Sequence, residues 1–208
     1  MASLVIVAGA SPVRADVWRA TDAAGDVVTY TYSFDPPPCG SLTKRDVPAD
    51  GTTDIVAVSV RHESDAVDLS ARFAYLAAWG PQSVSFDIKT EDRAFEVTVT
   101  RQRTNGPVWV GLWTQSRETP EPTSAVPTRR ARLAGPVRAS AHSSIPPWDL
   151  VSVNVPRQCL GTPRWVRVGV DTLRFLDCDT ARTDVWAPAG TDEAALSIPD
   201  GPRVRHSR

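Results

Sequence analysis

The stretch Val151–Val170, VSVNVPRQCLGTPRWVRVGV, contains two short segments in which every second residue is valine. Valine occupies positions 151, 153 and 155 in the first segment and positions 166, 168 and 170 in the second. A period of two is typical of a strand that buries one face, and β-branched residues favour strands. Pro156 has no N–H for a neighbouring strand, so we expect the first strand to end there. The two valine faces predict strands that pack on one shared core.

The same alternation recurs along most of the chain. We expect strands within 54–62, 66–75, 84–88, 95–99 and 108–114, separated by turns rich in Gly, Pro, Asn and Asp. Helical periodicity is nearly absent. The sequence therefore predicts an all-β fold: a single antiparallel β-sandwich, jelly-roll-like or immunoglobulin-like, with little helix.

This sandwich domain is expected to occupy residues 16–186. Residues 116–135 form a Pro/Arg-rich loop within it, and residues 187–208 form an irregular tail that frays. The segment 34–50 is expected to be a loop, because three consecutive prolines and a glycine interrupt it.

Two further hairpins are expected. The first lies within Asp16–Ser33, with the sequence DAAGD at Asp22–Asp26 as its turn. The second pairs Arg164–Val170 with Leu173–Leu176.

The composition excludes several classes of protein. The chain has 208 residues, a formal net charge of −1 and 41% hydrophobic residues, as in an ordinary globular domain. A nearly neutral chain offers no basic surface for nucleic acid. No apolar run approaches the roughly 18 residues of a membrane-spanning helix. We therefore expect neither a nucleic-acid partner nor a membrane span.

The first 15 residues resemble a signal peptide. Leu4–Ala10 is a short apolar run, and Val13-Arg14-Ala15 fits a cleavage site before Asp16. No Lys or Arg precedes Leu4, so the basic region of a signal peptide is incomplete, and a first β-strand is the alternative. We expect a secreted or cell-surface protein.

The chain has three cysteines, Cys39, Cys159 and Cys178. An odd number in an exported chain suggests one disulfide and one free thiol. We expect the bridge Cys159–Cys178, which would clamp the second hairpin and stabilise the fold by about 3 kcal/mol. A Cys39–Cys159 bridge and three free thiols are the alternatives. The spacing matches no zinc site.

Four segments together carry a resemblance: DAAGDV, DIVAVSVRHESDAVDLSARFAYL, VSFDIKTEDRAFEVTV and VPRQCLGTPRWVRVGV. In this order they resemble a group of uncharacterised exported proteins of actinobacteria, over nearly the whole chain after residue 15. More distantly, the layout is similar to DOMON and family-9 carbohydrate-binding modules, which are β-sandwiches. The resemblance implies a sandwich at the cell exterior and brings no established activity. Met1 is the only methionine, so the heme ligands of cytochrome-type DOMON domains are not matched.

A calcium site can be built from the first turn. Asp22, Asp26 and Asp54 supply the oxygen ligands that calcium prefers, and Gly25 allows a tight turn. The spacing is not that of an EF-hand loop. The alternative is an Asp-rich turn followed by the start of a strand. No other cofactor is expected.

Seven tryptophans are many for a chain of this length. Trp109 and Trp113 share one face of a strand, with Gly111 between them, and Trp165 lies opposite the valine face of its own strand. Indole rings stack on the apolar faces of sugars, so an exposed face of this kind predicts carbohydrate binding. The alternative is that these rings pack between the two sheets as core.

Catalytic signals are weak, and no catalytic residue is expected. His62 and His142 have no GxSxG motif near them. Asp87 and Glu96 lie on the outward faces of neighbouring predicted strands, where they could form the carboxylate pair of a glycosidase. The alternative is that both are solvated surface acids.

The sequence thus predicts a non-catalytic extracellular binding or surface-interaction module that can bind carbohydrate. Its partner would be a polysaccharide or another exported protein. A jelly-roll hydrolase and a purely structural envelope protein are the alternatives. An exposed aromatic strip would favour binding, and clustered acids in a cleft would favour an enzyme.

Overall fold

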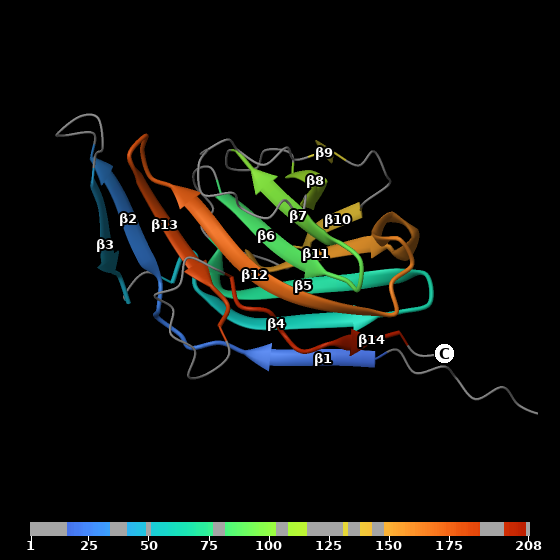
Figure 1. Cartoon of the computed structure of the whole chain (residues 1–208). Helices are drawn as coiled ribbons and strands as arrows, with labels where there is room; N and C mark the ends of the chain where they lie inside the picture. Colours follow the sequence, from blue (N-terminus) through green and yellow to red (C-terminus); the bar gives the residue numbers. More distant parts are fainter. Residues whose placement is uncertain are drawn as a thin grey trace, which may run out of the picture.

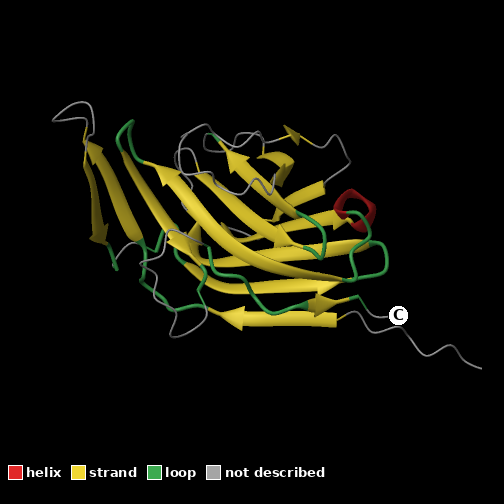
Figure 2. Cartoon of the chain, viewed as in Figure 1, coloured by secondary structure: helices red, strands yellow, loops and turns green. Residues whose placement is uncertain are grey.

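The computed structural model describes residues 16–33, 41–48, 51–76, 82–102, 108–115, 131–132, 138–142, 148–187 and 198–206. Two antiparallel sheets pack against each other, and the regular structure outside them is one short 3-10 helix, η1, at Arg157–Leu160 (Figures 1 and 2). The predicted all-β sandwich is confirmed.

The smaller sheet has five strands in the spatial order β1-β4-β5-β11-β10. In the order of the sequence they are β1 (Asp16–Thr21), β4 (Ile55–His62), β5 (Ala66–Leu76), β10 (Arg138–His142) and β11 (Trp148–Pro156). The hairpin expected from 54–62 and 66–75 is present as β4 and β5.

The larger sheet has nine strands, eight of them in the order β3-β2-β13-β12-β6-β7-β8-β9, with β14 pairing beside β12. They are β2 (Val28–Ser33), β3 (Ser41–Asp46), β6 (Gln82–Lys89), β7 (Ala94–Arg101), β8 (Val108–Gln115), β9 (Ala131–Arg132), β12 (Trp165–Phe175), β13 (Thr180–Val185) and β14 (Val204–Arg205). Figure 1 shows β2 and β3 at one end of this sheet.

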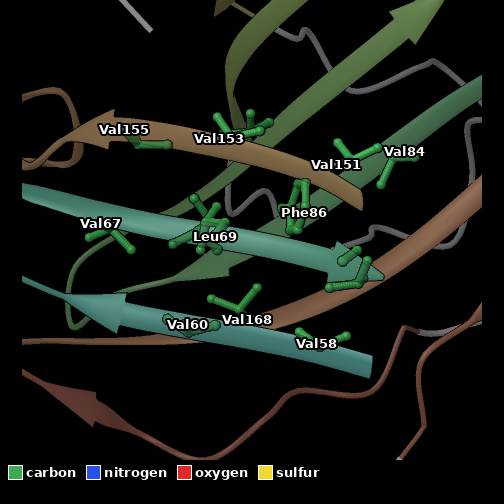
Figure 3. Close-up of a cluster of buried hydrophobic side chains, with 14 of the residues drawn as sticks. Val58, Val60, Val67, Leu69, Val84, Phe86, Val151, Val153, Val155 and Val168 are labelled. Carbon is green, nitrogen blue, oxygen red and sulfur yellow. The ribbon is translucent and has the colours of Figure 1, made fainter. Parts of the chain in front are cut away.

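The core lies between the sheets and follows the valine alternation. Val153 of β11 and Leu69 of β5 point inward from the smaller sheet, and Phe86 of β6 and Val168 of β12 point inward from the larger one (Figure 3). All six valines of the opening stretch are buried. Each such side chain stabilises the fold by about 1.5–3 kcal/mol relative to an exposed one.

The expected first hairpin is wrong, because β1 and β2 belong to different sheets. β1 pairs with β4, whereas β2 pairs with β3 and β13. The turn Asp22–Asp26 is therefore a connection between the two sheets. The segment 34–50 is also not all loop, because it contains β3.

The expected hairpin Arg164–Val170/Leu173–Leu176 is wrong as well, because β12 is one unbroken strand of 11 residues. Thr172 sits in its middle as a fully buried residue, and its hydroxyl donates a hydrogen bond to the carbonyl of Ser83. A polar residue that is satisfied in this way need not mark a turn.

The disulfide expected between Cys159 and Cys178 is absent, and both are free thiols. Cys159 lies before β12 and Cys178 lies after it. Eleven residues of extended strand span about 36 Å, whereas a disulfide needs Cα atoms within about 7 Å. Cys39 lies outside the described residues.

The tail was expected to fray, but residues 198–206 at its end are packed against the sandwich. The Gly201 N–H donates to Val168 O at 3.0 Å, and Val204 of β14 is buried in the core. The Arg205 N–H donates to Asp16 Oδ2 at 3.0 Å, which places β14 beside β1 (Figure 1). Residues 198–206 therefore line the edge of the sandwich between β12 and β1.

Candidate functional site

The connection between β1 and β2 brings three carboxylates together. One oxygen each of Asp22, Asp26 and Asp184 lies within 4.8 Å of the others. Asp184 comes from β13 and is 4% exposed. The predicted site residue Asp54, at the start of β4, is 3% exposed and bonds to the same turn. We call Asp22, Asp26, Asp54 and Asp184 the aspartate cluster.

Backbone hydrogen bonds position the two buried members of the cluster. The Gly25 N–H, between Asp22 and Asp26, donates to Asp54 Oδ2 at 3.0 Å. The Ile55 N–H donates to Asp184 Oδ2 at 2.6 Å. Gly25 has a φ of 85°, in the left-handed region that glycine adopts without strain. The cluster thus joins the β1–β2 connection to β4 in one sheet and β13 in the other.

Burial disfavours the charged forms of the Asp54 and Asp184 carboxyls, and repulsion from neighbouring carboxylates adds to this effect at Asp184. Burial, reinforced by the nearby Asp26 and Asp22 carboxylates, raises the pKa of Asp184 to about 8, although the hydrogen bonds from Ile55 and Val185 oppose this shift. Burial also raises the pKa of Asp54. A bound cation would relieve both effects, because a nearby positive charge favours the ionised carboxylate.

Asp184 is the member that sequence reasoning missed. It lies in TARTDV, which alternates only weakly, so nothing local distinguished it from a surface acid. One signal was available. Asp184 lies two residues before Trp186, and side chains two apart in an extended segment point to the same face, so a buried Trp186 would bring Asp184 to the buried side as well.

Two of the three predicted tryptophans lie together on the outer face of β8. Trp109 is 60% exposed, so it is not a core residue. Trp113 is half-buried, and its indole packs on Gly111, where an added Cβ would come within 2.6 Å of Trp113 Nε1. The absence of a side chain at Gly111 lets the ring of Trp113 lie along the strand toward Trp109. We call Trp109, Gly111 and Trp113 the β8 aromatic face.

The structure does not bring Trp165 to this face. Trp165 belongs to β12, and β6 and β7 lie between β12 and β8. Its half-buried ring is covered by the guanidinium of Arg203, at 4.6 Å from the ring centroid. A second aromatic pair, Trp18 and Trp186, packs edge-to-face with centroids 4.9 Å apart. Trp165 therefore supports the tail of the chain.

Polar residues of β7 and β6 flank the β8 aromatic face. Glu96 is directly opposite Trp113 on one side and Asp87 on the other. The hydroxyl of Thr98, opposite Gly111, donates to Glu96 Oε1 at 2.9 Å. The two acids considered as a catalytic pair are thus cross-strand neighbours, and Glu96 is buried.

His62 takes part in packing. Its ring is fully buried, and Nδ1 lies 3.2 Å from Val204 O. The ring of His206 meets it edge-on with centroids 5.7 Å apart. His62 thus holds β14 against β4. The side chain of His142 lies outside the described residues.

A hollow of about 1010 Å³ adjoins β1. Its lining includes Arg19, Arg72, Ser59 and Ser70, and the two serine hydroxyls lie 2.7 Å apart. Arg19, Ser59 and Ser70 also line a neighbouring hollow of about 290 Å³ on the same sheet. The lining of the larger hollow also includes Trp18, Trp186 and Leu150, so most of it is apolar, and the arginines and serines form its polar part.

The described part of the chain contains no helix with the length and apolar character needed to cross a membrane. No protein-family model, curated protein or solved structure matches this chain.

Proposed function

We propose that the protein is a non-catalytic binding module of the cell exterior that takes carbohydrate on the β8 aromatic face. The observation that carries this proposal is the 60% exposure of Trp109 on the outer face of a regular strand. Contiguous apolar patches that are rimmed by polar residues mark binding sites, and Trp109 and Trp113 share one face that is bordered by Thr98 and Thr100 of β7.

The geometry of the face suits a chain of sugars. Residues four apart on a strand have Cα atoms about 13 Å apart, which is the separation expected for Trp109 and Trp113. The Trp113 indole extends over Gly111 and shortens the gap between the rings. Thr100 and Thr98 of β7 are half-buried and lie opposite Trp109 and Gly111, where their hydroxyls can bond sugar hydroxyls.

The test is binding of soluble polysaccharides by the wild type and by Trp109→Ala, measured by affinity electrophoresis and calorimetry. Phe175→Ala is the matched control, because Phe175 is also an exposed aromatic residue, at 49%. We expect Trp109→Ala to lose about tenfold or more in affinity, or about 1.4 kcal/mol, with little change in Tm. Phe175→Ala should bind as the wild type does.

A second variant probes the same face without removing a ring. In Gly111→Ala the new methyl group collides with Trp113 Nε1, so the indole must swing away from Trp109. Sugar affinity should fall although both tryptophans remain. Equal binding by all variants would reject the β8 aromatic face as the sugar site. No binding to any polysaccharide would reject the proposal and favour a structural or protein-binding role.

The alternative function is a glycoside hydrolase at the same face, favoured by the direct cross-strand pairing of Asp87 and Glu96. Paired residues have Cβ atoms about 4.5–5.5 Å apart, so the two carboxyl groups share one face and can approach the separation of about 5–5.5 Å that retaining glycosidases use. Release of reducing ends by the wild type, abolished in Glu96→Gln, would establish this activity. Binding without such release would favour the module.

A further inference from the structure

The aspartate cluster has the composition of a site for a hard divalent cation. All of its side-chain donors are carboxylate oxygens, which calcium prefers, whereas zinc sites use histidine and cysteine. Two oxygens that share one calcium ion at 2.3–2.6 Å lie at most about 5 Å apart. The oxygens of Asp22, Asp26 and Asp184, all within 4.8 Å of one another, meet this limit.

A separate observation at Asp54 points to a missing ligand. Asp54 is 3% exposed, and its Oδ2 is directed at the turn by the Gly25 N–H. Its other oxygen, Oδ1, is buried and accepts no hydrogen bond from the described residues. A buried carboxylate oxygen without a donor is costly, because ionised groups need a partner when they leave water. Asp54 is not one of the three acids whose oxygens lie within 4.8 Å of one another, but it is bonded to the turn that carries two of them, where a cation would place a positive charge.

We propose that Asp22, Asp26 and Asp184 hold a divalent cation, with calcium as the ion, next to the buried carboxylate of Asp54, and that this site ties the β1–β2 connection to both sheets. Asp54 directly precedes β4 of the smaller sheet, and Asp184 is the second-last residue of β13 in the larger sheet. The ion would bridge these two strands where the chain crosses between them. Its role is structural: it fixes the sandwich at the end where β2 and β3 extend the larger sheet.

The experiment measures the Tm of the full chain in calcium-free buffer and after addition of CaCl₂. At a calcium concentration one hundred times Kd, the Tm of the wild type should rise by about 5–10 °C. MgCl₂ at the same concentration should give a smaller rise, because magnesium demands octahedral geometry and keeps its waters. A wild-type Tm unchanged by calcium would overturn the proposal.

Asp184→Asn is the diagnostic variant, because it keeps the shape of the side chain and removes its charge. Asp65→Asn is the matched control, since Asp65 is an exposed aspartate in the turn between β4 and β5. Calcium should raise the Tm of Asp65→Asn as in the wild type and that of Asp184→Asn by much less. Equal rises in the two variants would show that calcium binds elsewhere.

A second readout does not depend on stability. Terbium replaces calcium and emits when a nearby indole is excited, and Trp186 lies two residues after Asp184. Tryptophan-sensitised terbium emission should appear with the wild type, be displaced by CaCl₂ and fall at least tenfold in Asp26→Asn. Emission that survives in Asp26→Asn would contradict the site. Trp109→Ala should keep the calcium response. The calcium proposal is therefore tested independently of carbohydrate binding.

Discussion

His62 on β4 lies 3.2 Å from the backbone carbonyl of Val204 on β14, through its Nδ1 atom, and is fully buried there. This contact fixes the last strand of the chain against the smaller sheet, although β14 pairs with β12 of the larger one. One imidazole thus helps to close the edge of the sandwich. Because the ring can titrate, the closure depends on pH.

Acid should weaken the protein through His62. Burial lowers the pKa of His62 below its usual value of 6.5, and nearby Arg157 and His206 lower it further, against the opposing effects of Val204 O and Glu91. Below pH 6.5 the His62 imidazole of the unfolded chain binds a proton. In the folded chain it does so only at the lower pKa of the buried ring. Stability should therefore be full above pH 6.5 and fall by up to about 1.4 kcal/mol per pH unit below it. Urea unfolding at pH 7.5, 6.5 and 5.5 measures the slope.

His62→Gln provides the comparison for this slope. Glutamine can still donate to Val204 O, but it does not titrate. We expect the variant to lose less stability than the wild type between pH 7.5 and 5.5. Identical pH profiles for the two proteins would assign the acid sensitivity to other groups.

The strands could be predicted from the sequence, but some of their partners could not. Alternation is a local property, so β4, β5 and β8 appear within one or two residues of the expected limits. Pairing depends on distant segments. The turn Asp22–Asp26 looks like that of a hairpin, yet the strand after it joins the other sheet, because β2 finds its partners in β3 and β13.

Close packing between the tail and β1 should make Gly201 intolerant of a side chain. A Cβ at Gly201 would lie 2.7 Å from the Trp18 ring and 3.0 Å from Val168 O. Trp18 cannot retreat easily, because its ring already packs against Trp186. We expect Gly201→Ala to cost about 1–3 kcal/mol, seen as a lower Tm in calorimetry.

Gly51→Ala is the control for that substitution. A Cβ at Gly51 would meet only the Ala74 methyl group, at an ordinary 3.6 Å. Its effect should stay within about 0.5 kcal/mol. If Gly201→Ala were equally mild, the tail would not pack on Trp18 as described.

The candidate sites could be predicted only in part, because the sequence places residues of one turn or strand together but not residues of distant segments. Two members of the aspartate cluster lie in one turn, so the sequence alone places them together. Asp184 reaches them only because β13 pairs with β2, a contact between distant segments. Likewise, Trp109 and Trp113 share one strand and could be grouped from their spacing, whereas the position of Trp165 depended on the order of strands in the sheet.

The two described thiols should react separately and should not form a bridge with each other. Cys178 is exposed in the turn between β12 and β13, and Cys159 is partly buried in η1 at the opposite end of β12. Iodoacetamide should therefore label Cys178 of the folded protein faster than Cys159, because Cys178 is the more accessible to solvent. Peptide mass spectrometry measures both rates, and unfolding in urea should abolish the difference. A Cys159–Cys178 peptide after mild oxidation of the folded chain would contradict the continuous β12, because that strand holds the two sulfur atoms too far apart to bond.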